Sequence, residues 1–508
     1  MKKNKVLELN DLLKKIQLFR KLNPKKKVVL CHGIFDILHI GHLRYFKEAK
    51  KIGDFVVASV TADKHVIKGL NRPYFNDNYR SEFLNSIEEV NAVYIDNSPS
   101  ALNIINKLKP DYYLKGDEYS NLKSDLTKKI YLEKKAVIQN GGKLVFSKNI
   151  VFSSSNLINN YFQEPSDNIS KYIKKIKNIK LTNQLIENLQ KIKKLSVLVI
   201  GETIVDKYII SEPLGKPGKD THLVIRNKSD KTFVGGSAAV AKNVSSFSDK
   251  VTLLSCVGEK KDYLKLINSY LTNKIKKKFI YKKDSPTIVK KRFIEEVSKQ
   301  KLFGEYLIND IQISKDEERK IINFLKNKKY DLAIVLDYGH GFITKKIIQK
   351  IRKCSKYLAL NAQINSSNIG HHSIKKLNKS DLLIINESEL RHEVRDRDSN
   401  VELIAKNFAK KNNFKNILIT MGASGSMLVD KKLKIIKCPA FETKYVVDKI
   451  GAGDTMLSVV APLFYLKNNN LTTVLIGNLA GAVSIRNLAN SISLNRIKLI
   501  RYYQTLLK

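Results

Sequence analysis

Short apolar runs alternate with segments of helical periodicity along the chain. Residues 27–30 and 55–60 form two such runs near the N-terminus, and residues 197–200 form another further along. The first run is followed by the amphipathic segment 43–51, whose apolar positions recur at the spacing of one helix face. Buried parallel strands that are each followed by a helix are typical of α/β proteins, so this pattern predicts an α/β fold.

The turn between the strand at 27–30 and the helix at 43–51 contains the first candidate chemistry. It holds His39 and His42 in a His-x-x-His arrangement, together with Gly33 and Gly41. Ligands of open α/β sheets bind at such strand-to-helix turns, and a helix N-terminus favours phosphate. Both imidazoles can face one polyphosphate and stabilise its charge during transfer. The pattern indicates nucleotidyl transfer; the alternative is that both histidines are ordinary helix-start residues.

A second turn, at residues 448–455, precedes the apolar helix predicted at 456–465. Its backbone N–H groups at 451–454 can surround the charge of a phosphoryl group in transfer. Asp454 is then placed to take the proton from an attacking hydroxyl, while Mg²⁺ neutralises the phosphates. The sequence predicts a phosphotransferase site here; the alternative is a tight turn whose aspartate only caps the helix.

Length and cysteine content limit the class of protein. A chain of 508 residues is long enough for two or three domains, each with its own core. No apolar stretch reaches the length of a membrane span, and no apolar signal core follows the basic N-terminus. The cysteines lack metal-ligand spacing, which indicates reduced thiols and a cytoplasmic protein. They are Cys31, Cys256, Cys354 and Cys438.

The charge balance is strongly basic. The chain has 92 Lys and Arg against 48 Asp and Glu, a formal net charge of +44. A nucleic-acid partner would require clustered cations for phosphate contacts. The lysines are instead spread along the whole chain without a nucleic-acid motif, as AT-biased codon usage produces. We therefore expect no nucleic-acid function, and a positive field that attracts nucleoside triphosphates and sugar phosphates.

A domain boundary is predicted between residues 161 and 195. The segment 163–168 is rich in turn-forming residues. Between 171 and 194, Ile and Leu recur among lysines at near-helical intervals, which predicts helices and not a flexible linker. The sequence thus predicts a first domain at 1–162, a helical linker at 163–194 and a second domain at 195–508.

The residues of the first turn resemble a known family. Their order matches the Gly-x-Phe-Asp-x-x-His-x-Gly-His signature of cytidylyltransferase-like nucleotidyltransferases. The resemblance continues through Lys68-Gly69, Arg72-Pro73, Arg80, Leu114-Lys115-Gly116 and Ser153-Ser154-Ser155. It implies a Rossmann-like domain in which His39 and His42 are catalytic. The residues that it implies in nucleotide or phosphate binding are Gly33, Phe35, Asp36, Lys115, Ser153 and Ser154.

The second turn resembles the Gly-Ala-Gly-Asp motif of ribokinase-like sugar kinases, and the motifs at 206, 235–243, 386–389 and 420–425 follow the order of that family. The resemblance implies an α/β domain with a small β lid, formed by segments 221–226 and 287–293, that often mediates homodimers. It implies Asp454 as the catalytic base, and Asn386 and Glu389 as organisers of Mg²⁺ through bound water. The implied sugar-binding residues are Asp206, Gly235, Gly236 and Asn243. The implied contacts to ATP or its phosphates are Asn386, Glu389, Thr420, Gly422, Gly425, Gly451, Ala452 and Gly453.

A fusion of two such domains resembles the bifunctional ADP-heptose synthases, in which the kinase usually comes first. The resemblance implies a kinase acting on a heptose 7-phosphate and a nucleotidyltransferase acting on the sugar 1-phosphate. The resemblance implies ATP as the nucleotide substrate. Because His32 stands where the synthases usually have Asn, CTP stays open as the alternative for the transferase. The product would serve lipopolysaccharide or another surface polysaccharide.

Two departures from that family keep alternatives open. Residues 361–363 are Asn-Ala-Gln where the family commonly has Asp-Pro-Lys, and His340 replaces a lysine. The second domain is therefore either an active sugar kinase or a non-catalytic sugar-binding module beside an active nucleotidyltransferase. His340 is either a changed substrate contact or a solvated loop residue. A nucleic-acid-binding protein on an old enzyme scaffold is the third reading, suggested by charge alone.

Overall fold

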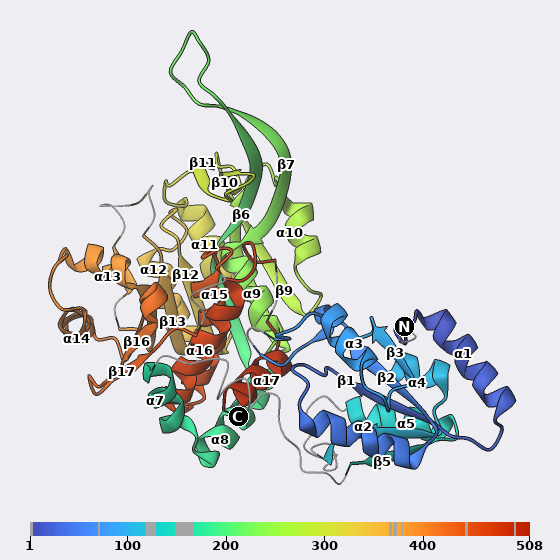
Figure 1. Ribbon diagram of the computed structural model, residues 1–508. Coiled ribbons are helices and arrows are strands. Elements are labelled where there is room, and N and C mark those ends of the chain that lie inside the picture. The colour runs from blue at the N-terminus through green and yellow to red at the C-terminus, as the bar shows by residue number, and fades with distance from the viewer. Residues whose placement is uncertain are drawn as a thin grey trace. The chain divides into compact units, whose positions relative to one another are not determined.

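The computed structural model describes residues 4–69, 72–117, 129–147, 167–364, 368, 373–377, 379–441, 446–491 and 494–507. The chain divides into two compact units (Figure 1). The first comprises Met1–Pro165 and Ile500–Lys508, and the second comprises Ser166–Leu499.

The first unit contains a five-stranded parallel sheet in the order β3-β2-β1-β4-β5. Its strands are β1 (Val28–Gly33), β2 (Phe55–Thr61), β3 (Ala92–Asp96), β4 (Tyr112–Lys115) and β5 (Lys143–Phe146). Its helices are α1 (Leu9–Leu22), α2 (Ile40–Ile52), α3 (Asp77–Asn85), α4 (Leu102–Leu108) and α5 (Lys129–Gln139), with the single turn η1 (Asp63–His65). The strand order reverses between β1 and β4, so the carboxyl ends of these strands border the crevice where such sheets bind ligands.

Apolar side chains fill both faces of this sheet. Val28 and Leu30 of β1 belong to a core with residues of α1, α4 and α5. Val29 and Cys31 point the other way and join a core with residues of α2 and α3. Strands buried on both faces are nearly continuous apolar runs, which is why β1 and β2 can be recognised in the sequence.

The second unit contains a long, mostly parallel sheet in the order β9-β8-β6-β12-β13-β14-β15-β16-β17, in which only β16 and β17 are antiparallel to their neighbours. The strands are β6 (Ser196–Gly215), β8 (Lys250–Gly258), β9 (Ile275–Lys282), β12 (Tyr330–Asp337), β13 (Ser355–Ala362), β14 (Leu382–Asn386), β15 (Asn416–Thr420), β16 (Ser426–Val429) and β17 (Ile435–Cys438). Together the two units confirm the α/β architecture predicted from the sequence.

A smaller sheet, which we call the lid, continues from the same strand β6. The inner half of β6 pairs with β8 and β12 as far as Glu202, and from Ile204 onward β6 pairs with β7 (Val224–Gly235) and β10 (Ile288–Glu295). The lid order is β7-β6-β10-β11, with β11 at Lys301–Leu307. Figure 1 shows the outer parts of β6 and β7 as a long hairpin that projects from the unit. The predicted lid segments fall at the start of β7 and in β10.

Helices cover both faces of the large sheet. Residues of α11 (Lys315–Phe324), α12 (Lys345–Cys354), α13 (Glu387–Val394) and α14 (Val401–Asn412) share one core with alternate residues of the central strands. On the other face, α9 (Gly236–Ser245) contacts β6 and α15 (Ala452–Tyr465), and α15 contacts α16 (Asn470–Ser484). The remaining helices of this unit are α7 (Asp167–Ile176), α8 (Ile179–Lys191) and α10 (Leu264–Tyr270), with the single turns η5 (Ile192–Lys194), η6 (Ile374–Leu377) and η7 (Gly422–Ser424). The last helix, α17 (Arg496–Leu507), begins in this unit, and its residues from Ile500 onward belong to the first.

The helices α7 and α8 occupy the segment between the two predicted domains. The Tyr172 hydroxyl of α7 donates to the carbonyl of Leu471 at 3.0 Å, and Asn188 of α8 donates to Asn468 at 3.0 Å. Both helices therefore pack beside the start of α16. Because α7 begins at Asp167, the predicted turn segment 163–168 is helical at its last two residues.

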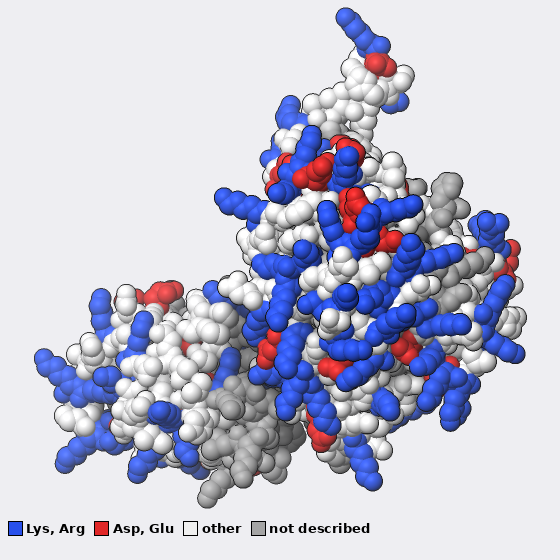
Figure 2. All heavy atoms as spheres, turned by 180° about the vertical axis from the view of Figure 1, so that it is seen from behind, with Lys and Arg blue, Asp and Glu red and all other residues white. Residues whose placement is uncertain are grey.

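Basic side chains are distributed broadly over the surface. Figure 2 shows Lys and Arg spread over the face in view, with few Asp and Glu between them and no single basic stripe. Within the part of the chain that the structure describes, no helix has the length and apolarity needed to cross a membrane.

Candidate active sites

The turn after β1 is fixed by aromatic packing. Gly33 ends β1, and the ring of Phe35 lies against it. Phe35 has a φ of 55°, and its buried ring packs against His42, Tyr45 and Phe46 at centroid distances of 5.8, 6.4 and 5.3 Å. Gly33 and Phe35 thus set the path of the chain into α2.

The two histidines at the start of α2 are held by the backbone. His39 is the N-cap of α2, and its Nδ1 accepts the N–H of Gly41 at 3.1 Å. Nδ1 of His42 accepts the N–H of His39 at 3.4 Å, and the ring centroids are 4.1 Å apart. An accepting Nδ1 means that each neutral ring carries its hydrogen on Nε2.

Both histidines are neutral near physiological pH. Burial, followed by the charges of His39 and Lys68, lowers the pKa of His42 to about 3. Burial and Lys68 also lower the pKa of His39 from its usual value. Neutral imidazoles that carry hydrogen on Nε2 can donate to a phosphate oxygen without changing their own charge.

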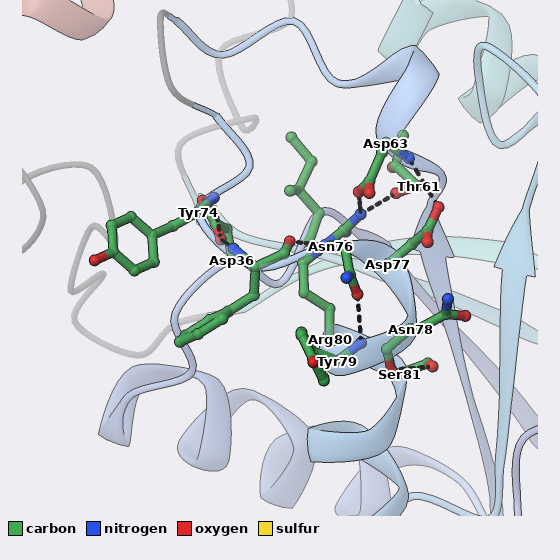
Figure 3. Close-up of polar contacts among 12 residues, drawn as sticks. Asp36, Thr61, Asp63, Tyr74, Asn76, Asp77, Asn78, Tyr79, Arg80 and Ser81 are labelled. Atoms are coloured by element: carbon green, nitrogen blue, oxygen red, sulfur yellow. Dashed lines mark hydrogen bonds and ion pairs between the residues drawn. The ribbon is translucent and has the colours of Figure 1, made fainter. Parts of the chain in front are cut away.

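Asp36 lies in the same turn, but its carboxylate contacts the loop that precedes α3 (Figure 3). Both of its oxygens accept the N–H of Tyr74 at 2.9 Å, one accepts the N–H of Phe75 at 3.2 Å, and Arg72 lies 3.8 Å away. Asp36, which the family resemblance implies in nucleotide binding, therefore anchors this loop.

Arg80 of α3 joins three parts of the first unit (Figure 3). Its fully buried guanidinium donates to the carbonyls of Ile34, Thr61 and Phe75, the last two at 2.9 Å, and to the carboxylate of Asp63. The arginine thereby ties the carboxyl ends of β1 and β2 to α3. This network fixes the edge of the sheet from which the two histidines are presented.

Lys115 ends β4, the neighbour of β1 at the point where the strand order reverses. Its Nζ donates to the carbonyl of His32 at 3.1 Å and lies 3.9 Å from Glu133 Oε2. The predicted lysine is thus at the expected edge of the sheet. Ser153 and Ser154, also predicted to bind nucleotide or phosphate, lie outside the described residues.

In the second unit, the start of α15 forms a turn suited to an anion. Gly451 has a φ of 83°, and a Cβ there would lie 2.4 Å from Asn490 Oδ1, so only glycine fits. Around Gly453, an added Cβ would meet none of the described atoms within 4 Å, which leaves space above the first turn of the helix. Ala452 and Gly453 belong to that turn, whose free N–H groups favour an anion.

Asp454 lies in this first turn and has an unusual acidity. Loss of surrounding water, followed by the charge of Asp206, raises the pKa of Asp454 to about 7, against the lowering effects of Tyr338 and Lys290. The Tyr338 hydroxyl donates to the carboxylate and lies 3.3 Å from each oxygen. A carboxylate with a pKa near neutrality can take a proton from a sugar hydroxyl.

Asp206 of β6 lies close to the turn at the start of α15. A Cβ on Gly235, the last residue of β7, would lie 2.4 Å from Asp206 Oδ2 and 3.6 Å from Asn490 Nδ2. Asn490 therefore lies against both Gly235 and Gly451. The structure in this way brings the implied sugar-binding residues together with the implied phosphoryl-transfer turn.

Helix α9 adds two more of the implied sugar-binding residues. Gly236 is its first residue, with a φ of 61°, and Asn243 lies two turns further along. The side-chain amide of Asn243 donates to Thr455 Oγ1 at 3.5 Å, directly after Asp454. This contact places the last turn of α9 beside the first turn of α15.

Asn386 and Glu389 form a reciprocal cap at the start of α13. Asn386 Oδ1 accepts the N–H of Glu389 at 2.7 Å, and Glu389 Oε2 accepts the N–H of Asn386 at 2.9 Å. Burial is the main cause that raises the pKa of Glu389 to about 7, and the charge of Asp454 adds to it. The charge of Asp454 thus acts on Glu389.

The loop after β15 lies at the same sheet edge. Thr420 ends β15 and is the register partner of Asn386 on β14. Gly422 and Gly425 turn the chain back into β16 with φ values of 56° and 90°. These three residues, implied in ATP binding, thus neighbour the reciprocal cap of α13.

A family comparison identifies the second unit. The profile of pfkB family carbohydrate kinases matches residues 194–495. The chain belongs to this family. The profile described as cytidylyltransferase-like matches residues 30–160, so a pfkB kinase domain follows a cytidylyltransferase-like domain in one chain.

Relatives and solved structures extend this comparison. The chain is 39% identical over 121 residues to "Bifunctional protein HldE" of Campylobacter fetus subsp. fetus, covering 23% of this chain and 25% of that protein. It is 33% identical over 119 residues to the protein of the same description from Methylobacillus flagellatus, covering 23% and 24%. The chain thus spans about a quarter of the length of these curated relatives, within the nucleotidyltransferase part. A ribokinase structure from Thermotoga maritima has a TM-score of 0.49 at 21% identity, over 61% of this chain and 99% of that one.

Two buried carboxyls of the pfkB domain fit Mg²⁺. Burial is the main cause that raises the pKa values of Asp454 and Glu389, and a cation bound with the nucleotide would stabilise their ionised forms. Among the described residues, no group of three or more His, Cys, Asp and Glu is arranged to hold a metal ion by itself.

His340 of the pfkB domain is not a solvated loop residue, and that alternative is wrong. The side chain is 1% exposed, and its Nδ1 lies 2.5 Å from Asp310 Oδ1. Its carbonyl accepts a hydrogen bond from Lys282 Nζ at 3.0 Å. The contacts with Lys282, at the end of β9, and with Asp310, in the loop after β11, come from distant parts of the chain, so the local sequence does not reveal this burial.

Sequence reasoning did not single out several residues of the kinase site. Tyr338 contacts the proposed base, and Arg292 of β10 forms an ion pair with Asp206 at 2.5 Å. Lys290 of β10 is buried near the same groups, and Asn490 lies between two of the glycines. Tyr338 stands two residues before His340, in the segment Asp337-Tyr338-Gly339-His340-Gly341 where a lysine of the synthases is replaced, so that segment was a usable signal. The lysine and arginine carry no signal in a chain so rich in basic residues.

Asp448 links the lid to the turn at the start of α15. Its carboxylate accepts from the Tyr208 hydroxyl of β6 and from the N–H of Ala489 at 3.1 Å, and it pairs with Lys301 of β11 at 3.0 Å. Asp448 precedes Gly451 by three residues. The lid strands and the turn at the start of α15 are therefore connected by one buried carboxylate.

Proposed function

We propose that the chain is a bifunctional transferase that makes a nucleotide-activated heptose or a similar sugar, as ADP-heptose synthases do, for lipopolysaccharide or another surface polysaccharide. In the kinase domain, the anomeric hydroxyl of a heptose 7-phosphate attacks the γ-phosphate of ATP. After removal of the 7-phosphate, the cytidylyltransferase-like domain transfers AMP from ATP, or CMP from CTP, to the sugar 1-phosphate.

The observation that carries this proposal is the position and acidity of Asp454. The carboxyl lies at an anion-binding helix start, close to Asp206, with a pKa near 7. It can therefore accept the proton of the attacking hydroxyl, while N–H groups at 451–454 stabilise the phosphoryl group. Mg²⁺ bound near Asn386 and Glu389 would neutralise the negative charge of the nucleotide phosphates. An inert sugar-binding module would not require such a base.

The first domain supports the second half of the reaction sequence. The neutral rings of His39 and His42 suit the α-phosphate of a nucleotide at the start of α2, since each carries hydrogen on Nε2. The attacking group is a sugar phosphate, already an anion, so no base is required. Positioning and hydrogen bonding supply the rate.

The lid also suits association of two copies, and we propose a homodimer through it. β7 and β11 are the outer strands of the lid, and the projecting hairpin exposes Leu214 and Leu223 by 50% and 46%. Light scattering of the intact chain tests this. A Leu214→Asp and Leu223→Asp double variant should convert a dimer of about twice the chain mass to a monomer.

Phosphorus NMR of the purified protein tests the two reactions. With Mg²⁺, heptose 7-phosphate and ATP, we expect signals of a sugar 1,7-bisphosphate and ADP. Addition of a phosphatase specific for the 7-phosphate, followed by fresh ATP or CTP, should produce a nucleotide diphospho-sugar and pyrophosphate. Turnover of a supplied sugar 1-phosphate without any kinase signal would instead favour an inactive, sugar-binding second domain.

A further inference from the structure

The lid carries a buried lysine next to the implied sugar site. Lys290 of β10 is the register partner of Asp206 on β6, and register partners of neighbouring strands point to the same face of the sheet. Lys290 is only 6% exposed. Arg292, two residues further along, lies on that same face.

The two cations differ in what they contact. Arg292 is committed to Asp206 at 2.5 Å, and its guanidinium lies 5.5 Å from the centroid of the Tyr208 ring. Among the residues that the structure describes, the ammonium of Lys290 has no ion pair and no hydrogen bond, and the centroid of the Tyr306 ring is 5.4 Å away. Burial is the main reason why the pKa of Lys290 is lowered. Buried ammonium groups without a partner are costly, which points to a partner outside the protein.

The neighbouring carboxylates have other partners. Asp206 pairs with Arg292, and Asp310 pairs with His340. The buried Glu202 accepts the N–H groups of Tyr338 and Phe342, and Asp454 accepts from the Tyr338 hydroxyl. Lys290 is nevertheless near enough to lower the pKa of both Asp454 and His340. The missing partner is therefore an anion that enters beside the reacting centre.

We propose that Lys290 binds the phosphate of a sugar phosphate beneath the lid, and that it makes the kinase select phosphorylated over unphosphorylated sugars. This inference rests on the proposed kinase function of the domain. The γ-phosphate of the nucleotide has the same chemistry, but the N–H groups at 451–454 already serve a transferring phosphoryl group. Lys290 lies on the sugar side, beside Asp206.

Calorimetry on the full-length chain tests the proposal with two substitutions and a matched control. The ligands are heptose 7-phosphate, unphosphorylated heptose and a non-hydrolysable MgATP analogue. Lys290→Met should weaken the binding of heptose 7-phosphate about 10-fold or more, which is the scale of a lost hydrogen bond to a charged group. The affinities for unphosphorylated heptose and for the MgATP analogue should not change. Lys290→Arg should retain affinity within a few-fold. The control Lys291→Met alters the adjacent residue, which points to the opposite face and pairs with Glu305, and should change nothing.

Inorganic phosphate separates this inference from the proposed reaction. It is titrated while the MgATP analogue saturates the nucleotide site, so that binding reports the second anion site alone. Phosphate binding that Lys290→Met abolishes would support the site even if heptose 7-phosphate were not a substrate. Two results with Lys290→Met would overturn the inference. One is weaker binding of the MgATP analogue with unchanged binding of heptose 7-phosphate. The other is an equal loss of affinity for phosphorylated and unphosphorylated heptose.

Discussion

The two candidate active sites each begin at a helix start, yet they control charge in opposite ways. His39 and His42 have lowered pKa values, and their Nδ1 atoms are occupied by backbone N–H groups, so both rings are neutral donors. Asp454 has a pKa raised to about 7 and receives the Tyr338 hydroxyl, so it can gain a proton near physiological pH.

The difference follows from the nucleophile that each proposed reaction uses. A sugar phosphate is already an anion when it attacks the α-phosphate, so the first site needs only donors for the developing charge. A sugar hydroxyl must lose a proton when it attacks the γ-phosphate, so the second site needs a base. One chain thus carries a site without a base and a site built around one.

Removal of the base should separate the two activities most strongly. Asp454→Asn is expected to lower kinase turnover by about 10²-fold or more, the scale of general-base loss, because the amide cannot accept the hydroxyl proton. Release of ADP measures the kinase, and release of pyrophosphate measures the transferase. Loss of pyrophosphate release as well, in protein that melts at the normal temperature, would disprove independent sites.

The reverse separation should follow from His42→Ala. Loss of one donor to the transition state is expected to slow pyrophosphate release by about 10²- to 10³-fold. ADP release by the kinase should not change. His65→Ala is a matched control, because His65 lies outside the motif and contacts the carbonyl of Asn97. Equal losses in both histidine variants would mean that the site lies elsewhere.

The pH dependence should distinguish the two sites without mutation. A carboxyl with a pKa of about 7 is protonated below that pH, so kinase kcat/KM should fall about tenfold between pH 8 and pH 6. His42, whose pKa is lowered to about 3, remains neutral throughout this range. Pyrophosphate release should therefore show no acidic limb from the His42 ring. A kinase profile that is flat from pH 6 to pH 8 would contradict the assigned role of Asp454.

The smallest expected effect concerns Tyr338. Its hydroxyl stabilises the ionised form of Asp454, so Tyr338→Phe should move the acidic limb of kinase kcat/KM upward by roughly half to one pH unit. At pH 9 the turnover should stay within a few-fold of the wild type. A uniform loss at every pH, with an unmoved limb, would show that the hydroxyl acts in some other way.

The sequence predicted the parts of both sites that are contiguous. The turn with His39 and His42 and the turn with Asp454 each combine a strand or helix signal with the reactive residue in one short segment. The α/β fold was predictable for the same reason, since strands buried on both faces are apolar runs that stand out. The roles of the individual site residues remain predictions.

The sequence could not reveal what depends on distant pairing. The hydrogen bonds of Asp36 to the loop at 74–75 depend on such pairing, and its implied nucleotide contact stays a prediction. Lys290 becomes a candidate site residue only when β10 pairs with β6, because that pairing buries it beside Asp206. His340, in the loop after β12, is buried where Lys282 at the end of β9 and Asp310 in the loop after β11 contact it. Such contacts are set by register and packing, which local periodicity does not encode.

The continuity of β6 restricts how this kinase can change over evolutionary time. One 20-residue strand serves first the large sheet and then the lid, with the change of partners between Glu202 and Ile204. Because side chains alternate along a strand, one inserted residue before Asp206 would turn that carboxylate to the opposite face. A lid exchanged with that of a related kinase will therefore keep this carboxylate on its present face only if the number of residues added or removed at the junction is even. The length of the hairpin tip is not restricted in this way.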